Sequence, residues 1–88
     1  MRVKVRGILM RFTDYQSEVT VDGDTVRDGL MDMCDKFPGL SDVLLDREGG
    51  VRPTHLVALN GETLNHEQLD SPAGDDDRVD IVTAVSGG

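Results

Sequence analysis

The sequence contains one cysteine, Cys34, among 88 residues, so neither an internal disulfide nor a multi-cysteine metal site can form. No apolar run approaches the ~20 residues that a membrane-spanning helix needs. The charged N-terminal segment MRVKVRG is not followed by an apolar signal region, so we expect a cytoplasmic protein. These absences exclude a disulfide-rich scaffold, a zinc ribbon and a membrane protein.

Basic residues are scarce, because nine Lys and Arg stand against 17 Asp and Glu, for a net charge of −8. Such a surface repels phosphate backbones, so we expect no nucleic-acid partner. The acids are mostly Asp, and Lys4 and Lys36 are the only lysines. This bias suits a halophilic cytoplasm, where excess acid keeps proteins soluble, although high-GC coding also favours Arg over Lys.

The first half of the chain predicts two strands followed by a helix. Polar and apolar residues alternate over residues 2–6 and 18–21, and a phase slip at Gly7 indicates a bulge or a strand end. We expect a hairpin between these strands. A helical period then follows, with Thr25 as its N-cap, Gly29 packed closely on a strand and Pro38-Gly39 as its end. Its apolar face consists of Val26, Leu30, Met33, Cys34 and Phe37.

The second half predicts a short helical turn over 40–45, a strand over 55–59 and a return strand over 62–64, joined by the hairpin turn Asn60-Gly61. Residues 69–77 are expected to form a loop before a last strand at 78–82. The fold class is therefore α+β, with a mixed sheet of four to five strands and one main helix packed across it. The last strand is expected beside the first, which makes it central. The expected sheet core comprises Val3, Val5, Val19, Val21, Val57, Leu59, Val79 and Ile81.

No residue cluster predicts an enzyme. Cys34 lies on the apolar helical face and is expected in the core. His55 and His66 are 11 residues apart and lack the clustered partners of a metal site. Asp75-Asp76-Asp77 lacks the ligand pattern of a calcium loop and predicts a solvated acidic turn. Lys4 and Lys36 are expected to be surface charges.

The sequence ends in Gly87-Gly88, and four residues separate this pair from the last predicted strand at 78–82. We therefore divide the chain into a domain at 1–83 and a flexible tail at 84–88, which extends at most about 17 Å. Its functional group is the terminal carboxylate of Gly88, which is a poor electrophile until it is converted to a mixed anhydride. The sequence has no GxxxxGK[ST] phosphate loop, so another protein must supply ATP and Mg²⁺. No cofactor or metal is expected on this chain.

Three segments resemble the MoaD/ThiS sulfur carriers, within the ubiquitin-like β-grasp superfamily. They are "GDTVRDGL" at the helix start, "LNGETL" at the hairpin and "LDSPAGDDDRVDIVTAVSGG" at the end. The resemblance covers nearly the whole chain in order, and Gly87-Gly88 is its one sharply specific motif. The ending also resembles that of the small archaeal modifier proteins. Thr83-Ala84 stand where molybdopterin-type members often carry two prolines.

This resemblance implies that a ubiquitin-activating-type enzyme adenylates Gly88 and that sulfur then displaces AMP to leave a thiocarboxylate. The acceptor would be molybdopterin, tRNA or another compound, and a molybdopterin-synthase-type large subunit would be a partner. In the archaeal modifiers the activated carboxyl forms an isopeptide bond with a target lysine. The chain itself would be a monomeric co-substrate.

We also expect the activating enzyme to contact the sheet face near the last strand, because a tail alone makes few contacts for the entropy it loses. The candidates for this docking patch and the tail contact are Val82, Val85, Ser86, Met10 and Phe12. The alternative is a β-grasp interaction module whose tail is incidental.

Overall fold

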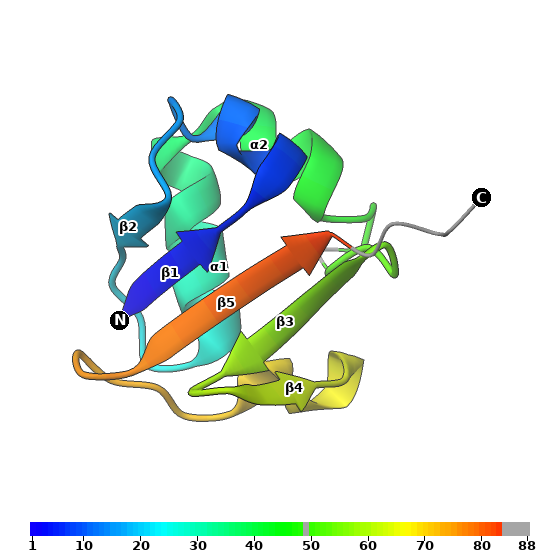
Figure 1. Ribbon diagram of the computed structural model, residues 1–88. Coiled ribbons are helices and arrows are strands. Elements are labelled where there is room, and N and C mark those ends of the chain that lie inside the picture. Colours follow the sequence, from blue (N-terminus) through cyan, green and yellow to red (C-terminus); the bar gives the residue numbers. More distant parts are fainter. Residues whose placement is uncertain (49, 84–88) are drawn as a thin grey trace.

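Five strands form one mixed sheet in the order β2-β1-β5-β3-β4 in the computed structural model, which describes residues 1–48 and 50–83 (Figure 1). The strands are β1 (Arg2–Val5), β2 (Glu18–Thr20), β3 (His55–Leu59), β4 (Glu62–Leu64) and β5 (Arg78–Thr83). The helices are α1 (Val26–Lys36) and α2 (Pro38–Leu44), and two 3₁₀ helices are η1 (Gly7–Phe12) and η2 (His66–Asp70). The α+β prediction is confirmed.

The last strand lies at the centre of the sheet, as predicted. β5 pairs in parallel with β1, where Val3 faces Val79 and Val5 faces Ile81. On its other side β5 pairs antiparallel with β3, where Val57 faces Ile81. β5 is therefore held on both edges by its neighbours.

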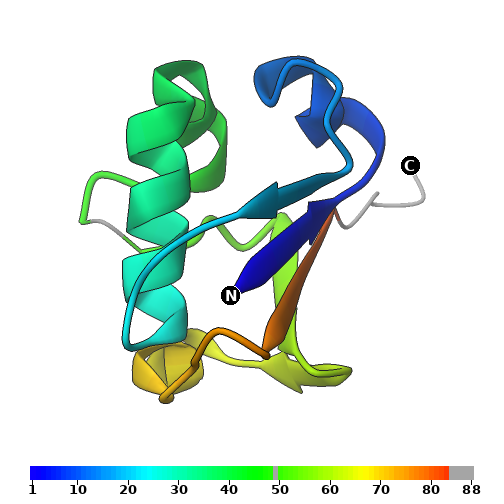
Figure 2. The same cartoon turned by 90° about the vertical axis from the view of Figure 1, so that its left-hand side faces the viewer.

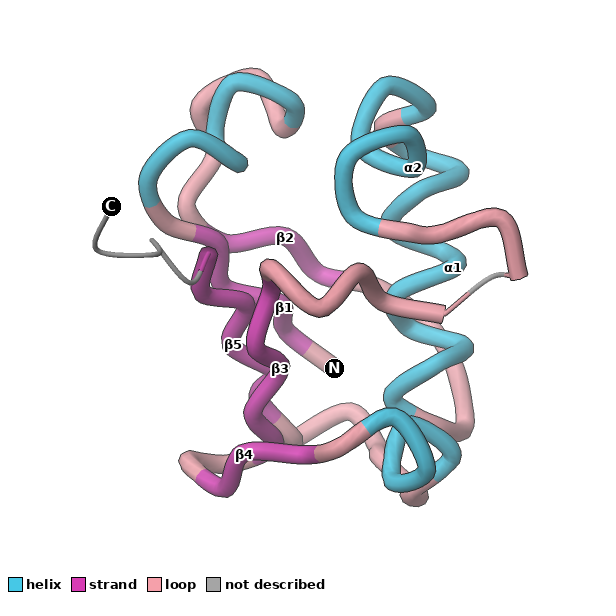
Figure 3. Tube along the Cα trace, turned by 90° about the vertical axis from the view of Figure 1, so that its right-hand side faces the viewer, coloured by secondary structure: helices cyan, strands magenta, loops and turns pink. Residues whose placement is uncertain are grey.

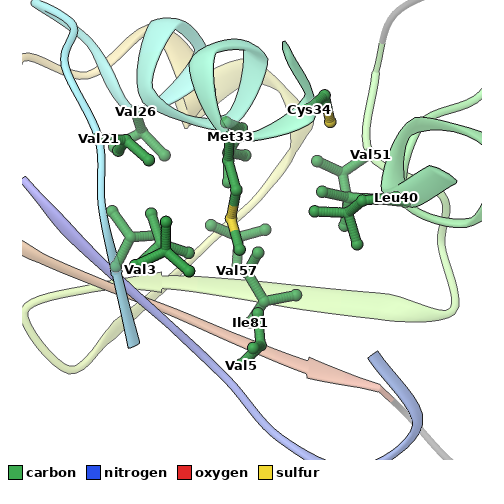
Figure 4. Close-up of a cluster of buried hydrophobic side chains, with 14 of the residues drawn as sticks. Val3, Val5, Val21, Val26, Met33, Cys34, Leu40, Val51, Val57 and Ile81 are labelled. Carbon is green, nitrogen blue, oxygen red and sulfur yellow. The ribbon is translucent and has the colours of Figure 1, made fainter. Parts of the chain in front are cut away.

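The helices α1 and α2 lie on one face of the sheet, which gives a two-layer structure (Figures 2 and 3). The core between the layers contains the predicted sheet residues and the face of α1, with Leu59 and Phe37 only partly buried at its margin. Figure 4 shows Met33 of α1 extending toward the side chains of the sheet. Met33 and Ile81 have no exposed surface, so the interior is closed at this point.

The start of α1 follows its sequence signals. The Thr25 hydroxyl accepts a hydrogen bond from the backbone N–H of Asp28 at 3.1 Å, which satisfies one of the unpaired amides at the helix start. Gly29 lies so close to the sheet that an added Cβ would collide with the Met1 sulfur and lie 3.3 Å from a Val21 methyl carbon. The close packing predicted for Gly29 is confirmed.

The predicted turn at Asn60-Gly61 is also confirmed. Both residues have positive φ angles, 50° and 92°, which a two-residue turn of this kind requires. The turn joins β3 to β4 and places Val57 opposite Leu64.

Three connections differ from the prediction. β1 ends at Val5, which confirms the strand end predicted near Gly7, and β1 pairs antiparallel with β2, but the connection between them contains η1, which starts at Gly7 with a φ angle of 65°. Pro38 does end α1, but it also occupies the first turn of α2, which is longer than the single turn expected over 40–45. η2 extends to Asp70 and takes up the first residues of the predicted loop over 69–77, where Leu69 is buried.

Candidate functional site

The candidate site lies where β5 ends at Thr83, the last residue that the structure describes. The predicted tail residues Val85, Ser86, Gly87 and Gly88 lie outside the described residues. What the structure gives is the position from which the tail departs: the end of a central strand that is paired with β1 and β3. The site is therefore built from the sheet around Thr83.

The face of the sheet opposite the helices carries an apolar pair beside this point. Side chains alternate along β5, so Val79 and Ile81 face the core while Val82 points outward and is 42% exposed. Its partner across the β3–β5 ladder is Leu56, which is 48% exposed. Contiguous exposed apolar surface marks protein contact sites when it is large enough, so this pair is a candidate for part of such a surface.

The two other predicted docking residues occupy η1. Met10 and Phe12 are partly buried and pack against the core, so much of their surface is not free for a partner. Ile8 of the same 3₁₀ helix is 57% exposed. η1 contacts β5 and lies at the end of the sheet where β5 stops (Figures 1 and 2).

Sequence reasoning missed Leu56 and Ile8 as docking candidates. In β3 the run HLVAL has apolar residues at consecutive positions, which is the signal that both faces of the strand are apolar. We define the docking patch from here on as Val82, Leu56 and Ile8. Its role in binding remains a prediction.

Basic residues on the same sheet face lie beside residues of opposite charge. Arg2 of β1 forms an ion pair with Glu18 of the adjacent strand β2, at 3.6 Å. Arg78 forms an ion pair with Asp80 of the same strand, at 3.3 Å. Lys4 stands between Glu18 and Asp80 in the register of the sheet. On this part of the sheet, basic side chains therefore lie beside acidic ones, although the chain as a whole has a net charge of −8.

His55 connects the end of β5 to α2. Its Nδ1 lies 3.3 Å from Thr83 Oγ1, and its Nε2 lies 2.8 Å from the carbonyl oxygen of Val43. His55 also lines a hollow of about 250 Å³, whose other wall includes His66 of η2. Among the described residues, no three His, Cys, Asp or Glu side chains are grouped so that they could hold a metal ion.

Cys34 is buried in α1 and packs in the core, as predicted (Figure 4). Burial raises the pKa of its thiol to about 11, with a smaller contribution from the charge of Asp35. The reactive thiolate is therefore disfavoured at neutral pH.

Lys36 and Asp77 have structural partners. The Lys36 ammonium lies 2.8 Å from the Asp32 carboxylate one helical turn earlier, and this hydrogen bond, together with a backbone N–H from Asp22, lowers the pKa of Asp32. Asp77 in the acidic turn accepts hydrogen bonds from Asn60 and from the backbone of Gly74. In the described part of the chain, no helix is long and apolar enough to cross a membrane.

Comparison with known proteins identifies one matching family model and several similar solved structures. The model of the ThiS family matches residues 3–88. A chain of the Amycolatopsis orientalis BexX/CysO complex is 26% identical, with a TM-score of 0.87, over 99% of this chain and 98% of that chain. Mycobacterium tuberculosis CysO is 28% identical, with a TM-score of 0.83, over 96% and 98% of the two chains.

An archaeal structure is equally similar. The small archaeal modifier protein 1 of Methanosarcina acetivorans is 28% identical, with a TM-score of 0.85, over 99% of this chain and 94% of that chain. Among curated proteins, no sequence matches significantly. These three structures are thus similar to this chain over nearly their whole length.

Proposed function

Because the chain belongs to the ThiS family of ubiquitin-like sulfur carriers and modifiers, we propose that its reactive group is the carboxylate of Gly88. In this proposal the protein is a co-substrate, and a ubiquitin-activating-type enzyme carries out the chemistry. The observation that carries the proposal is the family match, which extends over residues 3–88 and so includes Gly87-Gly88.

The proposed reaction has two steps. A Gly88 carboxylate oxygen attacks the α-phosphate of ATP, pyrophosphate leaves, and an acyl adenylate forms. A sulfide-equivalent nucleophile then attacks the acyl carbon and displaces AMP, which leaves a thiocarboxylate. We assign ATP and its Mg²⁺ to the partner enzyme. The charge that develops on the phosphates is best stabilised by preorganised groups in a confined site, and we place that site on the partner.

The position of β5 supports this role. The five residues from Ala84 to Gly88 reach at most about 17 Å beyond Thr83, far enough to enter a narrow channel in a partner. Thr83 ends the central strand and is still paired with His55 of β3, so a partner that docks on the sheet face has a defined starting point for the tail. In the docking patch, Val82 and Leu56 directly precede and follow the Thr83–His55 pair in the β3–β5 register, and Ile8 adds an exposed apolar side chain on η1, which contacts β5. One similar structure is itself a complex with a second protein.

The proposal includes several possible acceptors for the activated group. The thiocarboxylate would donate sulfur to molybdopterin, to tRNA or to another compound, and the activated carboxyl would alternatively form an isopeptide bond with a target lysine. A molybdopterin-synthase-type large subunit is a further partner in the first case.

Intact mass spectrometry of protein purified from its own host tests the proposal. Replacement of one oxygen by sulfur adds about 16 Da, and tandem fragmentation should place this mass on Gly88. Protein that carries no such mass and supports no ATP–pyrophosphate exchange with the host's activating enzyme would instead be an interaction module whose tail is incidental.

A further inference from the structure

His55 and Thr83 face each other where β3 begins and β5 ends. The Nδ1 atom of His55 lies 3.3 Å from the Thr83 hydroxyl oxygen. The Nε2 atom of the same ring lies 2.8 Å from the carbonyl oxygen of Val43, in the last turn of α2. One imidazole therefore joins the end of β5 to the helical layer.

The direction of each hydrogen bond follows from the groups involved. A carbonyl oxygen only accepts, so Nε2 donates its hydrogen to Val43. In the neutral ring Nδ1 is then an acceptor, and the Thr83 hydroxyl donates to it. If the ring gains a proton, Nδ1 donates and the hydroxyl oxygen accepts, so the contact persists in both charge states.

The two bonds have different roles. The last carbonyls of a helix have no partner within it, and a histidine side chain can satisfy one of them, as His55 does for Val43. Thr83 needs no such help, because the backbone pairing of β3 with β5 already extends to it. The side-chain bond adds a second constraint at the residue that precedes the tail.

We propose that His55 and Thr83 are positioning residues that fix the direction in which the chain leaves β5. This rests on the proposed function, in which the Gly88 carboxylate must meet ATP in the activating enzyme. A rotation of about 20° at Thr83 would move the end of a five-residue extended tail by up to about 6 Å. A misplacement of ~1 Å can cost about 100-fold in rate. The anchor at Thr83 therefore sets the point and the direction from which the tail enters the enzyme, and so limits the positions that an extended tail offers to the Gly88 carboxylate.

The variant Thr83→Val tests the anchor, because it removes the hydroxyl, keeps the shape and leaves the bond from His55 to Val43 in place. Thr63→Val is the matched control, since Thr63 is an exposed strand residue in β4 without a side-chain hydrogen bond to the described residues. Thr83→Ser restores a hydroxyl. All are compared with wild type in ATP–pyrophosphate exchange with the host's activating enzyme.

We expect Thr83→Val to lower kcat about tenfold and to change KM less than about twofold, because the docking patch is intact. Thr83→Ser should recover most of kcat, and Thr63→Val should match wild type. Wild-type kcat in Thr83→Val, or a defect confined to KM, would overturn the positioning role. Wild-type protein that supports no exchange would instead contradict the proposed function, and the positioning role with it.

A spectroscopic measurement tests the geometry without any enzyme. The ¹⁵N chemical shifts of the His55 ring report which nitrogen carries the hydrogen and whether the other accepts a hydrogen bond. We expect Nε2–H in wild type, and a shift of the Nδ1 signal in Thr83→Val but not in Thr63→Val. Identical Nδ1 signals in wild type and Thr83→Val would show that the bond does not form in solution and would overturn the proposal.

Discussion

Asn60 Nδ2 donates a hydrogen bond to Asp77 Oδ1 at 2.9 Å, and this contact joins the β3–β4 turn to the loop that precedes β5. The other Asp77 oxygen accepts from the backbone N–H of Gly74 at 2.7 Å, while Asn60 Oδ1 accepts from that of Arg78 at 2.9 Å. The hydrogen bond from the Asn60 side chain, and to a smaller extent that from the Gly74 backbone, lowers the pKa of Asp77. The start of the central strand is thus fixed by side chains from a neighbouring turn.

We expect Asp77→Asn to remove a pH-dependent part of the stability. Because the pKa of Asp77 in the folded protein lies below the ordinary value of 3.8, its carboxylate stabilises the fold above that value. This contribution is lost as the pH falls through the folded-state pKa. Urea unfolding should therefore give a difference between wild type and variant that is constant near neutral pH and shrinks below about pH 4. Asp76→Asn, at an exposed neighbour, is the control. A pH-independent difference would contradict the assignment.

Leu30→Ala should lower the free energy of unfolding by about 2–5 kcal/mol, because it leaves a cavity between α1 and the sheet. Leu30 is 2% exposed, whereas the adjacent Met31 is 46% exposed on the outer side of the same helix. Met31→Ala should therefore change stability by less than about 0.5 kcal/mol. Urea unfolding of both variants checks this, and equal losses would be incompatible with the packing of α1.

Changes at Gly88 should abolish adenylation and leave the fold intact. Deletion of Gly88 withdraws the carboxylate by up to about 3.6 Å, and addition of one alanine extends the tail by a similar length. Neither change should move the melting temperature. ATP–pyrophosphate exchange with the host's activating enzyme is the measurement. If wild type and both variants exchange equally, the carboxylate of Gly88 is not the reactive group.

Val82→Asp should weaken binding of the activating enzyme about tenfold or more, because it places a charge in the apolar docking patch. Met31→Asp is a matched control, since Met31 has nearly the same exposure as Val82 but lies on α1, in the other layer. Calorimetric titration should show a weaker Kd for the first variant alone. Equal affinity of the two variants would remove Val82 from the interface.

Molar KCl should raise the melting temperature, because salt screens the self-repulsion of a chain with a net charge of −8. Scanning calorimetry at low and molar KCl measures the difference. A melting temperature that does not change would contradict a halophilic source.

The elements that could be predicted from the sequence are those in which apolar residues recur at a regular spacing. Alternation in β1 and β5 and the apolar face of α1 identified the core, and Asn60-Gly61 identified the turn. η1 was missed because Ile8, Met10 and Phe12 continue a two-residue alternation that imitates a strand. In the 3₁₀ geometry Leu9 is instead buried and Ile8 is exposed.

α2 was underestimated because Pro38 has two roles. It cannot continue α1, yet its fixed φ angle suits the first turn of a new helix. The anchor of Thr83 on His55 was likewise beyond the sequence, since the two residues are 28 positions apart and meet only through the register of β3 and β5. A contact of that kind depends on which strands become neighbours, and local patterns do not contain that information.

The pairing of β5 also has a mechanical consequence. β1 and β5 run in parallel, so opposite forces applied at Arg2 and at Thr83 would load the hydrogen bonds between these strands in shear, all together rather than one after another. Force applied at Thr83 is at the same time resisted by the ladder to β3. Force applied between the two ends of the described chain would therefore meet the pairing of β1 with β5 in shear, the direction in which several hydrogen bonds share the load.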